Sequence, residues 1–343
     1  MKQSFVAWTP EQSRYYVETL QQFEAWGDAD SRVRTLAGAM AWKTAKGRQY
    51  LVRIRDRGQS SLGPRSPETE AMLHAFQADK TEAVKRLRAA ESRLAELAGF
   101  NIAARLNRVP KRAAGLLTML ARRGLLGRTI HVVGTHALYA YEAMAAAFLT
   151  PDLMETSDLD FLVDPRRRAS LRLAVAGVPP QRIIDVLREI DPSFEPVPKR
   201  KFSARNRDDF VVDLIKAAPK DPIRPSAPVA AGDIEPAEIV DLKWLVNAPK
   251  VQVMAVGEDG FPVPMSVPDP RAYALYKFHI SQDPRREPVK KIRDAAQAEA
   301  LVALVDARLP TYPFDPDQLR MFPRPLRQGV AVNPLWSTAP DAS

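Results

Sequence analysis

HVVGTHALYAYEA, residues 131–143, is followed fourteen residues later by SDLDFLVD, residues 157–164, and these two stretches decide the fold. In the first, β-branched residues lead into Gly-Thr and then into an Ala-rich segment, a pattern that predicts a strand, a tight turn and a helix. The second reads as another strand and carries Asp158 and Asp160. Because side chains alternate along a strand, both aspartates are expected on one face.

Two carboxylates this close repel each other unless a cation lies between them. Mg²⁺ prefers oxygen ligands and is commonly held by one or two carboxylates together with substrate phosphates. The segment Asp158-Leu159-Asp160 is therefore a candidate metal site. The alternative is that D-x-D arises by chance at a strand start, so the pattern needs support from elsewhere in the chain.

The Gly134-Thr135 pair lies where the first strand should turn into the helix. A glycine there lets the backbone approach a ligand closely, and the free N–H groups of a helix N-terminus attract anions. The Thr135 hydroxyl adds a hydrogen-bonding group for a phosphate oxygen. An ordinary turn with Thr135 as the N-cap explains the same residues.

A third carboxylate appears within DDFVVDLIK, residues 208–216. Asp213 lies inside an apolar strand, where a buried carboxylate is unfavourable unless it meets a cation or a hydrogen-bond network. Asp208 and Asp209 precede the strand and are interpreted as turn residues. Asp213 is the acid that requires an explanation.

The order strand, Gly-Thr turn, helix, D-x-D strand and a later strand with one Asp resembles the nucleotidyltransferase-fold superfamily, the polymerase-beta-like enzymes. The stretches SLGPRSPETE (61–70), GTHALYAYEA and SDLDFLVD are also similar to a little-characterised bacterial family of nucleotidyltransferase-like proteins. With YKFHIS in a C-terminal helix, the resemblance spans roughly residues 35–310. Two features depart from the superfamily: Thr135 replaces its usual Gly or Ser, and the segment between Gly134 and Asp158 is longer than in minimal members.

The resemblance implies a Mg²⁺-dependent transfer of a nucleoside monophosphate from an NTP to an RNA, protein or small-molecule acceptor. Two Mg²⁺ ions, with Mn²⁺ as an alternative, would be the cofactors. Asp158 and Asp160 would hold both metals, and Asp213 would complete the site of the catalytic metal and help to take the proton from the attacking hydroxyl. Nucleotide contacts would come from Gly134, Thr135, Ser157 and Lys277. A surface lysine extending from an apolar face explains Lys277 equally well.

The remaining pattern predicts an α+β fold, with a mixed β-sheet core flanked by helical additions. We expect four regions: a helical region with a β-hairpin and a long helical arm (1–110), a nucleotidyltransferase core (111–266), a C-terminal helical region (267–310) and a loosely attached Pro-rich tail (311–343). In the first region, helices are expected over 9–28 and from Pro67 toward Asn107, with the hairpin at 39–56. Residues 58–69 hold too many Gly, Pro and Ser for an element, and the Ala-rich helix is expected to run through 149.

Composition limits the other classes of function. The chain has 343 residues and no Cys, which excludes thiolate chemistry and favours a reducing cytoplasm. It has four His, none of them spaced as a helical zinc pair, so any metal should be a hard ion held by carboxylates. No stretch has the length expected of a membrane span, and the N-terminus lacks the apolar region of a signal peptide. A formal net charge of +9 permits an anionic partner, although a generally Arg-rich proteome explains it as well. Basic residues gather at Arg166–Arg168 and in KGRQYLVRIRDR, residues 46–57.

Two other hypotheses compete with an active enzyme. A non-catalytic module of the same fold would use the basic N-terminal region to bind nucleic acid or a protein partner. A helical scaffold would use the acids only to cap turns. The retention of three acids favours the enzyme, and an Asp inside an apolar strand disfavours the scaffold.

Overall fold

A computed structural model describes residues 4–55, 58–164, 182–219 and 232–327. The basic run Arg166–Arg168 lies outside these residues. The chain forms two compact units: one comprises 1–10, 107–258 and 263–343, and the other comprises 11–106 and 259–262. The expected division of the first unit into core, C-terminal helices and tail stays a prediction.

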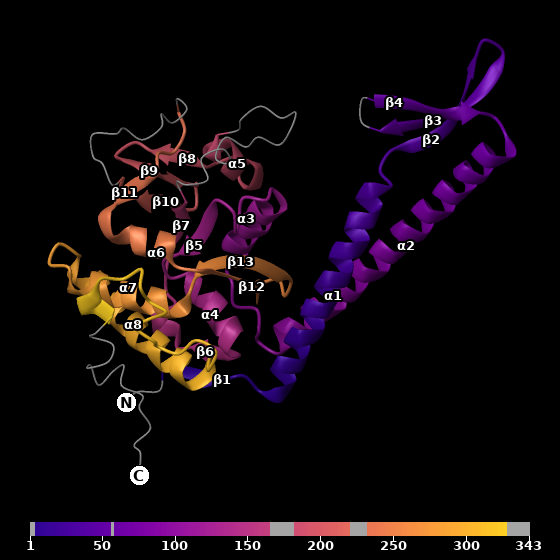
Figure 1. Ribbon diagram of the computed structural model, residues 1–343. Helices are drawn as coiled ribbons and strands as arrows, with labels where there is room; N and C mark the ends of the chain where they lie inside the picture. Colours follow the sequence, from indigo (N-terminus) through magenta and orange to yellow (C-terminus); the bar gives the residue numbers. More distant parts are fainter. Residues whose placement is uncertain (1–3, 56–57, 165–181, 220–231, 328–343) are drawn as a thin grey trace. The chain divides into compact units, whose positions relative to one another are not determined.

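The first unit is built around a six-stranded mixed sheet with the order β5-β7-β10-β9-β8, in which β11 also pairs with β10 (Figure 1). The strands are β5 (Ile130–Val133), β7 (Asp158–Val163), β8 (Glu195–Val197), β9 (Arg200–Arg205), β10 (Val211–Ala217) and β11 (Ala237–Ile239). The central strands β7 and β10 run parallel, whereas β5 is antiparallel to β7 and β9 is antiparallel to β10. Every residue of β5 is buried, as expected for an apolar strand covered on both faces.

Helices and two small sheets surround this sheet. The helices are α3 (Lys111–Arg122), α4 (Ala137–Ala145), α5 (Ile183–Ile190), α6 (Lys243–Asn247), α7 (Pro270–Gln282) and α8 (Pro288–Arg308), with short 3₁₀ turns η1 (Pro151–Leu153) and η3 (Val240–Leu242). The small sheets pair β1 (Phe5–Ala7) with β6 (Ala147–Leu149) and β12 (Lys250–Val256) with β13 (Pro262–Pro268). These elements and the central sheet bury one continuous apolar core. The prediction of an α+β fold is confirmed.

The second unit is a helix pair that carries a three-stranded sheet. Helix α1 (Pro10–Thr35) packs on α2 (Pro67–Ala103), and the sheet of β2 (Ala39–Ala45), β3 (Arg48–Arg55) and β4 (Gly58–Pro64) lies where α1 ends and α2 begins (Figure 1). On α2 the buried side chains recur at sevens, at Thr69, Phe76, Ala83, Ala90 and Leu97. This spacing keeps one face of a long helix against its partner.

Three expectations about elements are wrong. Residues 58–64 form β4, because an edge strand of a three-stranded sheet tolerates Gly and Pro, and Pro64 stands at its last position. Helix α1 continues to Thr35, past the expected end at 28. Helix α4 ends at Ala145, because Ala146 adopts a left-handed conformation (φ 47°) and the next residues pair with β1.

The expected loose tail is also wrong for the segment up to residue 327. Leu319 and Phe322 are buried at 1% and 2% exposure, and both belong to the core of the first unit. Arg271 on α7 donates to the Pro313 carbonyl and to Gln318 Oε1, both at 2.7 Å. Apolar burial and these hydrogen bonds hold the segment in place despite its Pro content. Across the described residues, no helix is long and apolar enough to cross a membrane.

Candidate active site

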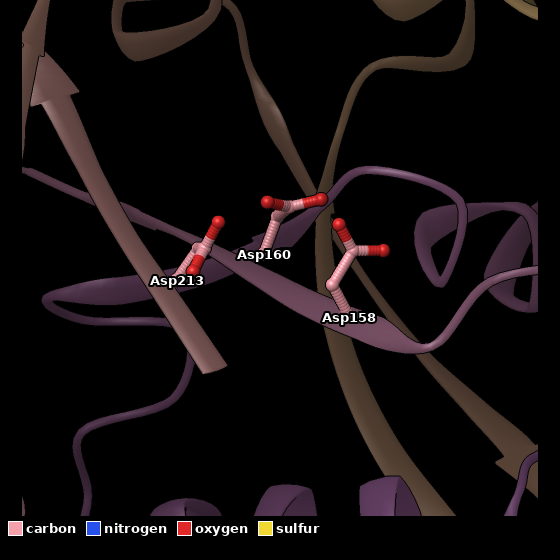
Figure 2. Close-up of side chains that lie close together, drawn as sticks. All are labelled: Asp158, Asp160 and Asp213. Atoms are coloured by element: carbon pink, nitrogen blue, oxygen red, sulfur yellow. The ribbon is translucent and has the colours of Figure 1, made fainter. Parts of the chain in front are cut away.

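Asp158, Asp160 and Asp213 converge on one point of the central sheet. One carboxylate oxygen from each lies within 4.8 Å of the other two, and Figure 2 shows the three side chains together, two from β7 and one from β10. The parallel register pairs Asp213 with Asp160 and Val211 with Asp158. Strand pairing therefore brings Asp213 beside Asp158 and Asp160, although it lies 53 or more positions farther along the chain.

The Gly134 turn lies directly against this acid cluster. Strand β5 pairs Val133 with Asp160, so the next residue, Gly134, follows beside the Asp160 carboxylate. Gly134 has a left-handed backbone (φ 66°), and a Cβ atom there would lie 2.0 Å from Asp160 Oδ2. The Tyr273 hydroxyl donates to the Gly134 carbonyl at 2.7 Å. Only glycine meets both the backbone and the steric requirement.

No residue in the described part of the chain directly compensates the charge of the Asp160 carboxylate. Among the described residues, none donates a hydrogen bond to it or forms an ion pair with it. Burial first, and then the neighbouring Asp158 and Asp213, raise the pKa of Asp160 to about 7. More distant cations, Lys277 and Arg286, lower the pKa only in part. A carboxylate in this environment is stabilised by a bound cation.

Asp213, in contrast, is held on both oxygens by strand β9. Arg200 donates to Oδ2 at 2.7 Å, and the Ser203 hydroxyl donates to Oδ1 at 2.6 Å. Ser203 is also the direct register partner of Asp213. Burial raises the pKa of Asp213, although Ser203 and Arg200 oppose the shift. These two contacts orient the Asp213 carboxylate toward the other acids.

Sequence reasoning missed Arg200 and Ser203. In the sequence they belong to RKFSAR, an ordinary polar strand with no local signal of function. Only the antiparallel pairing of β9 with β10 brings them to Asp213. The unusual placement of an Asp inside β10 was the one available signal that such partners exist.

Asp158 has a local partner and a buried neighbour. The Thr156 hydroxyl donates to Asp158 Oδ1 from two residues upstream. His136, the first-turn residue that follows Gly-Thr, is only 1% exposed, and within the described part of the chain neither ring nitrogen has a hydrogen-bond partner. Burial lowers the pKa of His136 to about 4, with Asp158 opposing the shift. His136 is therefore a neutral imidazole at pH 7.

Two other predicted nucleotide contacts differ in exposure: Thr135 is buried and Ser157 is exposed. Thr135 is 5% exposed, and its Oγ1 accepts from Gln297 Nε2 at 3.3 Å. Ser157 is exposed and immediately precedes β7; its backbone carbonyl accepts from the Val211 N–H at 3.3 Å. Thr135 therefore follows the Gly134 turn directly, and Ser157 lies next to Asp158 in the chain and is hydrogen-bonded to β10. Their contact with a nucleotide stays a prediction.

Lys277 is a buried ion-pair partner, not a surface lysine. Its Nζ donates to Asp294 Oδ1 at 2.7 Å, and its side chain is 7% exposed. Arg286 forms an ion pair with Oδ2 of the same Asp294 at 2.8 Å. Burial lowers the pKa of Lys277, while Asp294 and Asp160 oppose the shift. Asp294 thus holds two cations close enough to Asp160 to influence its pKa.

The geometry defines the class of protein: a candidate carboxylate metal site lies beside a glycine turn on a mixed sheet. A family model described as Nucleotidyltransferase matches residues 111–320, which is more than half of the chain and includes the three acids and the turn. The chain therefore belongs to this nucleotidyltransferase family. Neither the curated proteins nor the solved structures contain a significant match.

Proposed function

We propose that the protein is a Mg²⁺-dependent nucleotidyltransferase that transfers a nucleoside monophosphate from an NTP to an acceptor hydroxyl. The acceptor oxygen bonds to the α-phosphorus, the bond between the α- and β-phosphates breaks, and pyrophosphate leaves. The convergence of Asp158, Asp160 and Asp213 beside Gly134 is the observation that carries this proposal. The family match supports nucleotidyl transfer in general. The acceptor is an RNA, a protein or a small molecule with a nucleophilic hydroxyl.

The donor set fits divalent metal ions with a preference for oxygen ligands. Three carboxylates contribute oxygens within 4.8 Å of one another, and Asp160 has no other cation in direct contact among the described residues. Asp158 and Asp160 would hold two Mg²⁺ ions, and Asp213 would complete the site of one of them. When bound, the ions neutralise charge on the triphosphate and lower the pKa of the attacking hydroxyl.

The chain's own residues have distinct parts in this proposal. Arg200 and Ser203 hold the Asp213 carboxylate in position, and Asp213 assists removal of the proton from the acceptor hydroxyl. The Gly134-Thr135 turn receives the β- and γ-phosphates, because a Gly backbone allows close approach. Lys290 and Arg286 are cations near the acid cluster that would attract the triphosphate.

Labelled transfer tests the proposal directly. Purified protein is incubated with Mg²⁺, each α-³²P-labelled NTP in turn, and total bacterial RNA or lysate protein as acceptor. We expect label in a macromolecular product for at least one NTP. The label should be absent from the Asp158→Ala, Asp160→Ala double variant.

The matched control is Asp152→Asn, which changes an exposed aspartate on η1 outside the acid cluster. It should transfer label as the unchanged protein does. If no NTP gives transfer but Mg²⁺ and NTP still bind, small-molecule acceptors are screened next. Absence of both transfer and Mg²⁺-dependent NTP binding would replace the proposal with the non-catalytic module.

A further inference from the structure

The sheet of the second unit is far more basic than the helices that carry it. Residues 39–65 contain seven basic side chains and one acidic side chain: Lys43, Lys46, Arg48, Arg53, Arg55, Arg57 and Arg65 against Asp56. An excess of one charge sign over so short a segment creates a local potential that attracts the opposite charge.

Ion pairing separates three of these cations from those on the helices, whereas Arg65 pairs with Glu70 of α2. On α1 and α2, carboxylates neutralise most arginines, in the pairs Arg14–Glu18, Arg32–Asp79, Arg34–Asp30, Arg86–Glu82 and Arg93–Glu96. Within the described ranges, Lys43, Lys46 and Arg48 have no carboxylate partner. These three cations are therefore available to an external anion.

Strand register places two of these cations and one tyrosine on the same face of the hairpin. Lys43 lies opposite Tyr50, and Ala45 lies opposite Arg48, so alternation puts Lys43, Arg48 and Tyr50 on one side of β2 and β3. Lys46 stands between them at the β2–β3 turn, with a left-handed backbone (φ 49°). We call Lys43, Lys46, Arg48 and Tyr50 the basic hairpin face.

The opposite side of the sheet is already occupied. Arg53 lies over the Phe76 ring of α2 at 4.3 Å, and Met40 packs against the small core that contains Phe76. Met40 and Arg53 are register partners, on the side opposite to Lys43 and Tyr50. The contacts with Phe76 thus lie on the side opposite to the basic hairpin face. The three cations of this face are exposed and Tyr50 is half-buried, whereas Val52, farther along the same side, is buried.

We propose that the basic hairpin face binds single-stranded RNA. Its cations suit backbone phosphates, and an aromatic ring among them suits base stacking. On β4, Gln59 and Ser61 are exposed beside it, and Lys43 donates to Gln59 Oε1. These neutral hydrogen-bonding groups suit the ribose 2′-hydroxyl, which distinguishes RNA from DNA. If the protein catalyses the proposed nucleotidyl transfer, the bound RNA is the acceptor. Only this assignment of the acceptor rests on the proposed function.

Fluorescence anisotropy of the full chain with a labelled 20-nucleotide mixed-sequence RNA tests the binding without activity. The variant Lys43→Ala, Lys46→Ala, Arg48→Ala should weaken binding at least tenfold. It should also make the slope of log affinity against log salt shallower by about two, the value for three lost phosphate contacts on a single strand. Tyr50→Leu should weaken binding about fivefold with the slope unchanged, because stacking releases no counterions.

The matched control removes the same charge from exposed helical positions of the same unit: Lys85→Ala, Arg86→Ala, Arg88→Ala. We expect less than a twofold change in its affinity for RNA. Equal loss in both triple variants, or no binding by the unchanged chain, would overturn the proposal. Equal affinity for DNA of the same sequence, or full competition by poly-glutamate, would overturn the assignment to RNA.

The variant Asp160→Asn distinguishes RNA binding from nucleotidyl transfer. It changes the acid cluster and leaves the basic hairpin face intact, so this variant should bind RNA as the unchanged chain does, whether or not the chain transfers nucleotides. RNA binding without labelled transfer would keep the binding surface and reject the reaction. Labelled transfer to lysate protein with no RNA binding would reject the surface and keep the reaction.

Discussion

Gly134 and Asp160 adjoin so closely that a Cβ atom on residue 134 would lie 2.0 Å from Asp160 Oδ2. The contact joins the turn after β5 to the second acid of β7, and it leaves no space for any other residue type at position 134. A side chain at position 134 would therefore displace an acid of the cluster.

Gly134→Ala should lower both stability and metal binding. The Cβ atom must displace the Asp160 carboxylate, in addition to the backbone strain of a left-handed alanine, about 1–2 kcal/mol. Gly124→Ala is the matched control, because Gly124 has the same φ of 66° and nothing within 4 Å of its added Cβ atom. Thermal unfolding should show a larger loss for Gly134→Ala, and only this variant should lose stabilisation by Mg²⁺. Equal losses would contradict the steric argument.

Asp160→Asn should raise the melting temperature of the metal-free protein. The substitution removes a half-buried charge that two other carboxylates repel, with little change in shape. The same change should abolish the stabilisation of the unchanged chain by Mg²⁺, about 2.7 kcal/mol at a metal concentration 100 times Kd. Differential scanning fluorimetry with EDTA and with Mg²⁺ measures both effects. Asp152→Asn should alter neither, and a lower metal-free melting temperature for Asp160→Asn would count against a repulsive cluster.

The pH dependence of stability should carry the signature of Asp160. In the folded, metal-free protein its pKa is about 7, whereas an unfolded aspartate loses its proton near pH 4. Between these values the folded state binds more protons, so the free energy of unfolding falls as pH rises toward 7. Denaturant unfolding in EDTA, compared between the unchanged chain and Asp160→Asn, isolates this contribution. A difference between the two proteins that does not change with pH would show that Asp160 titrates normally.

The buried pair of Lys277 and Asp294 should respond unequally to the loss of each partner. Asp294→Asn leaves Lys277 buried without its carboxylate and should cost about 3–5 kcal/mol. Lys277→Met should cost less, because Arg286 still pairs with Asp294 at 2.8 Å. Chemical denaturation measures both values. An increase in KM for NTP in a folded Lys277→Met variant would support the predicted nucleotide contact, whereas an unchanged KM would restrict Lys277 to its ion pair.

Local patterns were enough to predict the elements that carry the acids. Alternation in SDLDFLVD places Asp158 and Asp160 on one face of a strand, and β7 begins at Asp158. Thr9-Pro10 predicts a helix start, and α1 begins at Pro10. The strand β4 was missed because its pairing with β3 outweighs the Gly and Pro content on which a local prediction depends.

The surroundings of the acids could not be predicted in the same way. Arg200 and Ser203 reach Asp213 through antiparallel pairing, and Gln297 reaches Thr135 from 162 residues away. The sequence left Lys277 as either a nucleotide contact or a surface lysine, and it could not show the ion pair with Asp294 of another helix that buries it. The spacing of nearby residues in the sequence predicts none of these contacts.

The sequence by itself determined which acids are candidate metal ligands, their order along the chain and, for Asp158 and Asp160, the strand face that they share, because these features depend on backbone geometry over a few residues. The tertiary structure alone decided that Asp213 lies opposite Asp160, that Gly134 closes on the same carboxylate and that no described residue pairs directly with the Asp160 carboxylate. Strand register depends on the packing of distant segments, and the pKa of Asp160 depends on the burial that this packing creates.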